Sequence, residues 1–153
     1  MGSVLVVNAG STSLKLSEVA PDETATRLDS LEAAGGAVDA VAHRIVHGGE
    51  RFREPVLVDD DVLRELESLT ELAPLHNAPA LAAVRDALRI LPEVPQVAVF
   101  DSAFHATIPE EASTYALSAQ VRGWGVRRFG FHGLSVQWAS EQVAAASLVV
   151  CHL

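Results

Sequence analysis

The order of strand-like and helix-like patterns constrains the fold of this chain more than any single motif does. Short apolar or alternating runs predict strands at residues 4–7, 14–17, 24–28, 38–46, 97–100 and 147–152. Apolar residues at helical spacing predict helices from Asp59 to the break at Pro74, over 77–91 with Asn77 as the cap, and over 135–146. Strands that precede helices and then alternate with them predict an α/β domain with a mixed sheet flanked by helices.

Composition narrows the classes of partner. The 153 residues suit one domain, and the net charge of -9 disfavours nucleic acid and anionic membrane surfaces. A single cysteine, Cys151, excludes an internal disulfide and favours a reducing compartment. No signal peptide precedes the first strand, and no apolar run approaches the roughly 18–20 residues of a membrane span. We therefore expect a cytoplasmic protein with neither a nucleic acid nor a membrane as partner.

The turn after the first strand carries phosphate-binding chemistry. It reads Asn8-Ala9-Gly10-Ser11-Thr12-Ser13-Leu14-Lys15 and contains the only lysine of the chain. Backbone N–H groups, hydroxyls and an ammonium are the groups that cradle a phosphate. The spacing is not that of a Walker A loop, and an ordinary polar hairpin turn explains the pattern equally well.

A second polar cluster lies in an apolar strand pattern, at His43-Arg44-Ile45-Val46-His47-Gly48-Gly49-Glu50. The two histidines are too far apart on a strand to share a metal. Arg44 is the more informative residue, because a guanidinium among hydrophobic neighbours suits a small carboxylate. An arginine paired with a nearby Asp or Glu is the simpler alternative.

Three further segments place single polar residues at element ends. They are Ala73-Pro74-Leu75-His76-Asn77, Val99-Phe100-Asp101-Ser102-Ala103-Phe104-His105 and Phe129-Gly130-Phe131-His132-Gly133. Asp101 stands where a predicted strand ends, which is where α/β folds place function. A zinc hydrolase could be composed from His76, Asp101, His105 and His132, but no pair has a recognised ligand spacing.

Together, in this order, and with Val150-Cys151-His152-Leu153, these segments resemble the acetate kinase family, which includes propionate and butyrate kinases. The resemblance implies the actin/hexokinase/Hsp70-type fold, whose domains are ribonuclease H-like. It also implies that residues 1–153 are an N-terminal domain whose second domain is absent. The reaction it implies is reversible transfer of the ATP γ-phosphoryl group to acetate, with Mg²⁺ (or Mn²⁺) and ATP/ADP, in a homodimer.

The family's residue roles carry over to matching positions only. By resemblance, the catalytic group is Asp101, His76 and His132, and the magnesium-associated residue is Asn8. The carboxylate site is Arg44 with Val46, Leu75 and Phe131 as its apolar wall. The nucleotide or phosphate contacts are Ser11, Ser13, Lys15, His152 and Leu153. After Gly133 the sequence departs from the family, with Leu134 and Val136 where Thr and His are usual.

The chemistry of the acceptor favours one division of labour among these groups. A short-chain carboxylate is ionised at pH 7 because its pKa lies near that of a side-chain carboxyl, about 4 to 5. Attack on phosphorus then needs positioning and charge neutralisation rather than a strong base. We therefore interpret Asp101 chiefly as an orienter of Arg44 or of a metal-bound water, and the proton-transfer role that the resemblance also implies is the second interpretation. The competing hypothesis is a non-catalytic module that binds anions or a partner, and we expect the isolated chain to be inactive.

Overall fold

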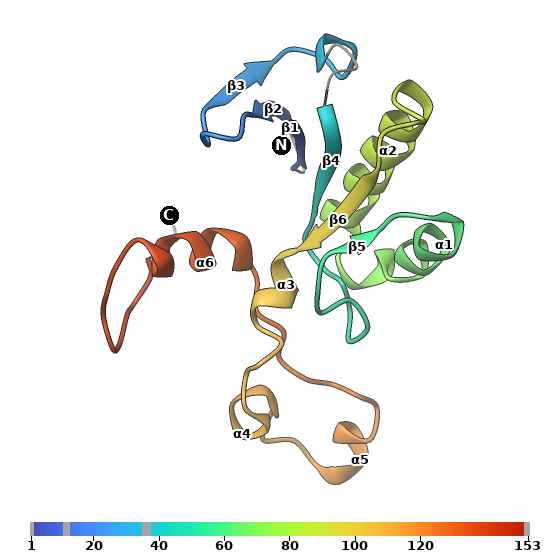
Figure 1. The fold of residues 1–153 in the computed structure, drawn as a ribbon. Coiled ribbons are helices and arrows are strands. Elements are labelled where there is room, and N and C mark those ends of the chain that lie inside the picture. The colour runs from blue at the N-terminus through green and yellow to red at the C-terminus, as the bar shows by residue number, and fades with distance from the viewer. Residues whose placement is uncertain (1, 11–12, 35–37, 152–153) are drawn as a thin grey trace.

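Six strands form one mixed sheet in the order β3-β2-β1-β4-β6-β5 (Figure 1). The computed structural model describes residues 2–10, 13–34 and 38–151. The strands are β1 (Ser3–Ala9), β2 (Leu14–Val19), β3 (Ala25–Leu28), β4 (Val38–Ile45), β5 (Val56–Leu57) and β6 (Gln96–Phe100). The central strands β1, β4 and β6 run parallel, and the outer strands β2, β3 and β5 pair antiparallel with their neighbours. The predicted mixed α/β sheet is confirmed.

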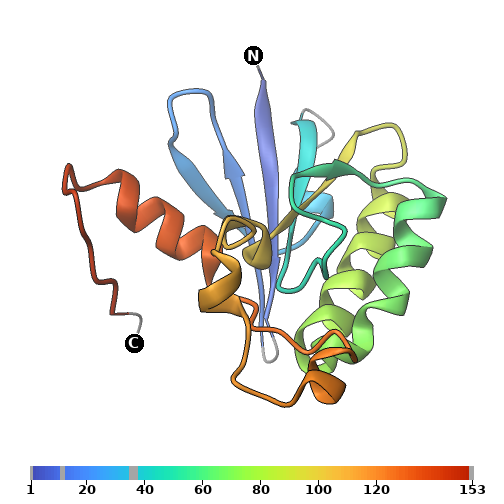
Figure 2. The same ribbon diagram turned by 90° about the horizontal axis from the view of Figure 1, so that it is seen from below.

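Helices cover the two faces of the sheet unequally. The longer ones are α1 (Asp60–Ser68), α2 (Pro74–Ile90) and α6 (Gly133–Glu141). Short turns of helix are η1 (Glu32–Ala34), η2 (Thr70–Leu72), α3 (Asp101–Phe104), α4 (Glu110–Ser113) and α5 (Ala119–Arg122). Helices α1 and α2 lie on one side of the sheet, and α6 lies on the other (Figures 1 and 2). The side chain of Asp59 caps α1 by accepting from the Val62 N–H at 2.8 Å.

The core lies between the sheet and α2. Alternate residues of β1, Leu5 and Val7, are almost wholly buried and join Leu81 of α2 in the hydrophobic cluster. The intervening residues of β1, such as Val6 and Asn8, face the side of the sheet that α6 covers only in part and are half-buried. Polar side chains on that face remain within reach of a ligand.

Most predicted elements are present, but several bounds differ. Helix α1 ends at Ser68, before the expected break at Pro74, and α6 ends at Glu141 rather than at residue 146. Helix α2 begins at Pro74 rather than at Asn77, because proline fits the first helical position, where a missing N–H costs nothing. Asn77 is therefore not a cap but a fully buried residue inside the helix. The strand expected at 147–152 is wrong over 147–151, which lie beyond α6 and away from both sheet edges (Figure 1). An extended segment with no strand beside it has no ladder to join. Gly35 and Gly36, a pair typical of loops, lie outside the described residues.

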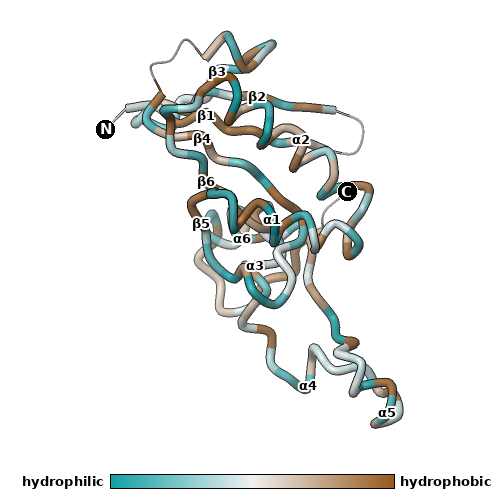
Figure 3. Tube along the Cα trace, turned by 90° about the vertical axis from the view of Figure 1, so that its right-hand side faces the viewer, coloured by the Kyte–Doolittle hydropathy of each residue, from teal (hydrophilic) through white to brown (hydrophobic). Residues whose placement is uncertain are grey.

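Residues 105–128 project from the sheet and carry α4 and α5 (Figure 1). The Arg128 N–H donates to the Ser113 carbonyl at 2.7 Å, and Thr114 forms a bridge with Arg127, so the base of this segment is closed. Figure 3 shows hydrophobic stretches within the segment as well as in the sheet, and Trp124 is 71% exposed. No helix in the described ranges is long and apolar enough to cross a membrane.

Candidate active site

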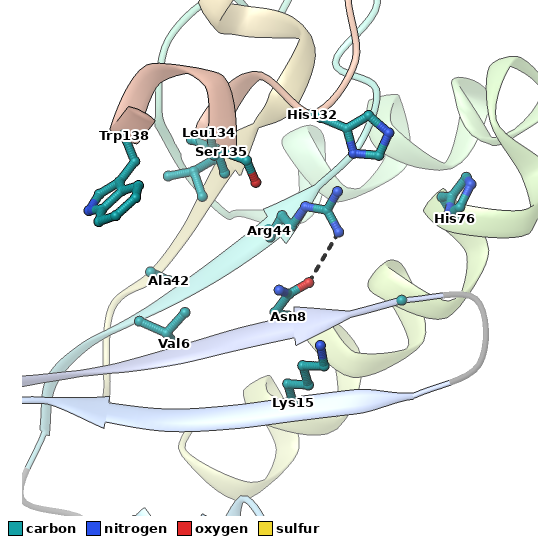
Figure 4. A pocket seen from close by; sticks show the side chains of 12 residues that line it. Val6, Asn8, Lys15, Ala42, Arg44, His76, His132, Leu134, Ser135 and Trp138 are labelled. Atoms are coloured by element: carbon teal, nitrogen blue, oxygen red, sulfur yellow. Dashed lines mark hydrogen bonds between the residues drawn. The ribbon is translucent and has the colours of Figure 1, made fainter. Parts of the chain in front are cut away.

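Strand register aligns three polar residues in a row across the half-buried face of the sheet. Asn8 of β1 is paired with Lys15 of β2 on one side and with Arg44 of β4 on the other. Residues directly opposite one another in a sheet project to the same face. The row Lys15–Asn8–Arg44 therefore places an ammonium, an amide and a guanidinium side by side (Figure 4).

Arg44 is held at both edges of its guanidinium group. Its Nε and Nη2 donate to the same oxygen of Asp101, Oδ2, at 3.0 and 2.5 Å, and its Nη1 donates to Asn8 Oδ1 at 3.2 Å. Asp101 is 1% exposed, and its other oxygen accepts from the Leu134 N–H at 3.3 Å. Both carboxylate oxygens thus have partners within the chain. This arrangement supports the interpretation of Asp101 as an orienter of Arg44.

A cavity of about 670 Å³ opens above this row (Figure 4). The sheet forms its floor, and the start of α6 and the first turn of α2 stand on two sides. Its lining residues are Val6, Asn8, Gly10, Lys15, Ala42, Arg44, His76, Val99, His132, Leu134, Ser135 and Trp138. Asn8 of β1 and Lys15 of β2, which are the predicted metal and phosphate residues among them, share it with both predicted catalytic histidines.

A smaller cavity of about 350 Å³ adjoins the first one. Arg44, His76 and His132 line both cavities, so they stand at the passage between them. The remaining lining residues of the smaller cavity are Val46, Leu72, Ala73, Asp101 and Phe131. One guanidinium facing an apolar wall is the chemistry that a short-chain carboxylate needs.

The apolar wall differs in one position from the predicted set. Val46 and Phe131 line the smaller cavity, but Leu75 does not, and its side chain is 73% exposed. Leu72 and Ala73, which precede α2, line the cavity where Leu75 was expected. Sequence reasoning missed both residues because it began the helix three residues too late. The correct helix start at Pro74 would have placed them at the helix entrance.

The loop that carries Phe131 and His132 is fixed by close packing. His132 has a left-handed backbone (φ 54°) and precedes α6, which is uncommon for a residue with a side chain. A side chain at Gly133 would overlap the carbonyl oxygen of Asp101, and one at Gly130 would overlap the His105 ring. His105 also contacts the Phe131 carbonyl through its Nε2 at 3.0 Å. His105 therefore supports the loop and does not line the cavity that contains Arg44.

The described residues do not form a metal site on their own. Within 2–10, 13–34 and 38–151 no group of three or more His, Cys, Asp or Glu could hold a metal ion. Asn8 Oδ1, the predicted magnesium ligand, accepts a hydrogen bond from a cation, Arg44. The nearby Asp101 carboxylate is already engaged at both oxygens. This donor set does not fit direct coordination of Mg²⁺.

Of the remaining predicted nucleotide and phosphate contacts, only Ser13 lies within the described residues. Ser13 is exposed and accepts the Gly10 N–H at its carbonyl, at 2.8 Å, which closes the turn. Ser11, His152 and Leu153 lie outside the described residues. Leu134, where the family has Thr, lines the larger cavity and donates its N–H to Asp101, a contact that any residue other than proline could make.

The family model described as "Acetokinase family" matches residues 23–153, which is most of the chain. The chain belongs to the acetokinase family. The acetate kinase of Thermotoga maritima is 46% identical over 76% of this chain and 31% of its own length, and that of Arthrobacter sp. is 40% identical over 93% and 46%.

A solved propionate kinase from Francisella tularensis superposes with a TM-score of 0.82 at 30% identity, over 93% of this chain and 48% of its own. The likeness confirms the expected actin/hexokinase-type fold for this acetokinase-family chain. The chain covers 31% to 48% of the length of these relatives.

Proposed function

We propose that this chain supplies the carboxylate-binding side of an acyl kinase that transfers the γ-phosphoryl group of ATP to acetate, reversibly. The observation that carries the proposal is the junction of the two cavities. A small cavity with one guanidinium and an apolar wall opens, past two histidines, into a larger one that contains the only lysine of the chain. Acceptor and phosphoryl group would meet at this junction.

Several residues that line the two cavities have roles that follow from their chemistry. Arg44, oriented by Asp101 and Asn8, binds the acetate carboxylate, and Val46, Phe131 and Ala73 enclose its methyl group. His76 and His132 face the transferring phosphoryl group from two sides of the passage, where their N–H groups would neutralise charge on its oxygens. Lys15 would contact the phosphates of the nucleotide in the larger cavity. Asp101 takes no proton, because the acceptor is already ionised.

The chemistry that Mg²⁺ bound to ATP would supply is neutralisation of phosphate charge, and no described residue is assigned to hold it. Since Asn8 Oδ1 already accepts a hydrogen bond from Arg44, we assign Asn8 to the positioning of Arg44 rather than to the metal. We propose no contact between the described residues and the nucleotide base, the metal or a second copy of the chain. Propionate is the second candidate acceptor, because a cavity of about 350 Å³ is not confined to two carbons and a neighbouring structure is a propionate kinase.

Titration of the isotopically labelled 153-residue chain with acetate, followed by NMR, tests the carboxylate site. We expect the amide signals of residues 44–48, 75–76 and 129–134, and that of Ala73, to shift. Arg44→Ala should weaken acetate binding more than about tenfold, since a charged hydrogen-bonded contact contributes on the order of 1.5–3 kcal/mol. Arg44→Lys should recover little, because lysine lacks the planar fork. Arg89→Ala, a surface arginine paired with Asp86, is the matched control. Equal effects of Arg44→Ala and Arg89→Ala would refute the site.

Turnover is tested in a chimaera in which this chain replaces the matching residues of the Arthrobacter acetate kinase. Acetyl phosphate, trapped as its hydroxamate, should form with the chimaera. Lys15→Ala should then lower kcat/KM by more than about tenfold. The 153-residue chain alone should give no product above background, because phosphoryl transfer needs groups on both sides of a closed cleft. Turnover by the chain alone at a rate near that of the chimaera would contradict this division.

A further inference from the structure

Three segments far apart in sequence meet at the smaller cavity, and two buried side chains join them. The segments are the end of β4, with Arg44 and the following residue Val46, the first turn of α2 with His76, and the loop with Phe131 and His132. Neither joining side chain, Asn77 nor His47, lines a cavity near Arg44. Both are nearly inaccessible, at 0% and 3% exposure.

Asn77 links α2 to the end of β4 through two hydrogen bonds, which together we call the clasp. Its Oδ1 accepts from the His47 N–H at 3.2 Å, and its Nδ2 donates to the His47 carbonyl at 3.0 Å. Only a primary amide side chain both donates and accepts in this way at this reach. His76 precedes Asn77, and Val46 precedes His47. The clasp therefore sets the distance between His76 and Val46, which both line the smaller cavity.

His47 fixes the loop to the same point. Its ring centroid lies 4.5 Å from that of Phe129 and 5.8 Å from that of Phe131, both in tilted or edge geometry. Its Nδ1 accepts from the Gly49 N–H at 2.9 Å, which sets the ring's orientation. Phe131 therefore packs on His47 on one side and forms the wall of the smaller cavity on the other.

We propose that Asn77 and His47 are positioning residues of the carboxylate site: they clasp β4, α2 and the 129–133 loop together, and so set the shape of the cavity that receives the acceptor. The proposal rests on the proposed function. It assigns no contact with substrate to either residue. The proposal predicts that substitutions of Asn77 or His47 weaken carboxylate binding more than an equally destabilising substitution elsewhere in the chain does.

Variants of the 153-residue chain separate positioning from general stability. Asn77→Ala removes the clasp, and Gln96→Ala is the matched control. Gln96 is also buried, and its side chain also donates to two carbonyls, those of Leu91 and Val94, but it lies at the opposite end of β6 from Asp101. We expect both variants to lower the urea midpoint. Asn77→Ala should weaken acetate binding, measured by NMR titration, more than tenfold, and Gln96→Ala less than threefold. Equal weakening by the two variants, or affinity of Asn77→Ala within twofold of the parent, overturns the proposal.

Substitutions at His47 supply a second measurement that does not depend on the folding of Asn77→Ala. His47→Phe keeps an aromatic ring against Phe129 and Phe131, and His47→Ala removes it. Acetate affinity should stay within threefold in His47→Phe and fall more than tenfold in His47→Ala, with the Phe131 amide signal displaced only in the latter. Equal affinities of the two variants refute the role of the ring. The parent chain is the separate check on the proposed function: if it fails to bind acetate, the carboxylate site itself is wrong, whereas loss confined to the variants concerns the clasp.

Discussion

The carboxylate of Asp101 accepts two N–H groups of Arg44 at a single oxygen, Oδ2, and leaves the outer edge of the guanidinium to Asn8 and the cavity. Asp101 comes directly after β6, and Arg44 lies on the adjacent parallel strand β4. The fold therefore supplies the orienting acid from the strand next to the arginine. An arginine fixed in this way loses less side-chain entropy when it binds an anion.

Substitution of Asp101 tests this orienting role directly. Asp101→Asn should weaken acetate binding to the chain more than about tenfold, because the guanidinium loses its charged partner and its fixed plane. The free energy of unfolding should fall by roughly 3 kcal/mol, as is typical when one partner of a largely buried ion pair is removed. NMR titration and urea unfolding measure the two effects. Asp86→Asn, at the exposed pair with Arg89, is the control and should change neither appreciably. Undiminished acetate affinity in Asp101→Asn would leave Asp101 with some role other than orienting Arg44.

Gly133 is the point at which α6 meets the strand end that bears Asp101. Any side chain there would overlap the Asp101 carbonyl oxygen and approach the Phe104 Cβ at 2.8 Å. Gly133→Ala should lower the free energy of unfolding by roughly 3 kcal/mol, since neither neighbour is a flexible chain end. Gly123→Ala, where the nearest atom is 3.3 Å away, is the matched control and should cost less than about 1 kcal/mol. Urea unfolding of the two variants decides whether α6 is packed as closely as the geometry requires.

Sequence patterns predicted five of the six described strands, and missed β5 (Val56–Leu57), because a two-residue strand carries too little local pattern. The strand that ends at Ala9 and the strand that ends at Ile45 show their apolar runs directly. The family resemblance brought Arg44, Asp101, His76 and His132 together, and the structure places all four around adjoining cavities.

What sequence reasoning missed depends on tertiary contacts. Asparagine is a residue type that commonly caps helices, and only the fold shows that the Asn77 amide reaches the backbone of residue 47. Leu72 and Ala73 line the cavity through the path of the chain into α2, which no periodicity encodes. The apolar run near residue 149 reads as a strand, but Val149 is 87% exposed, because pairing needs a neighbour that a local pattern does not specify.

Two buried histidines should make stability depend on pH. Burial lowers the pKa of His43 and of His47 below the usual value of about 6.5, and the hydrogen bond to Gln96 only partly opposes this at His43. Below about pH 6.5 the unfolded chain then binds more protons than the folded chain. The free energy of unfolding should therefore be fully present above pH 7 and decline as the pH falls through 6.5 toward the lowered values.

The slope identifies the residues responsible. Each histidine contributes at most about 1.4 kcal/mol per pH unit to the slope of the free energy of unfolding against pH. His43→Leu should therefore reduce that slope between pH 7.5 and 5.5, by no more than about 1.4 kcal/mol per pH unit. Urea unfolding of parent and variant at several pH values measures it. The variant serves as its own control above pH 7, where both forms carry a neutral side chain at this position. A slope that is the same in both proteins would assign the pH dependence to other groups.

Ala73 sets the size of the acyl end of the carboxylate site. It is 8% exposed, immediately precedes α2, and lines the smaller cavity with Val46 and Phe131. Ala73→Val adds two methyl groups to the wall, which should hinder longer acyl chains more than acetate because the guanidinium of Arg44 fixes the carboxylate end. The ratio of acetate to butyrate affinity should rise by about five- to fiftyfold, the effect of one or two methylene-sized clashes. NMR titrations of the chain with acetate, propionate and butyrate measure the ratio. The control is Ala82→Val, which lies within α2 and away from this cavity. An unchanged ratio would show that the acyl group does not extend toward Ala73, and would place the chain's discrimination among carboxylates at Val46 and Phe131 instead.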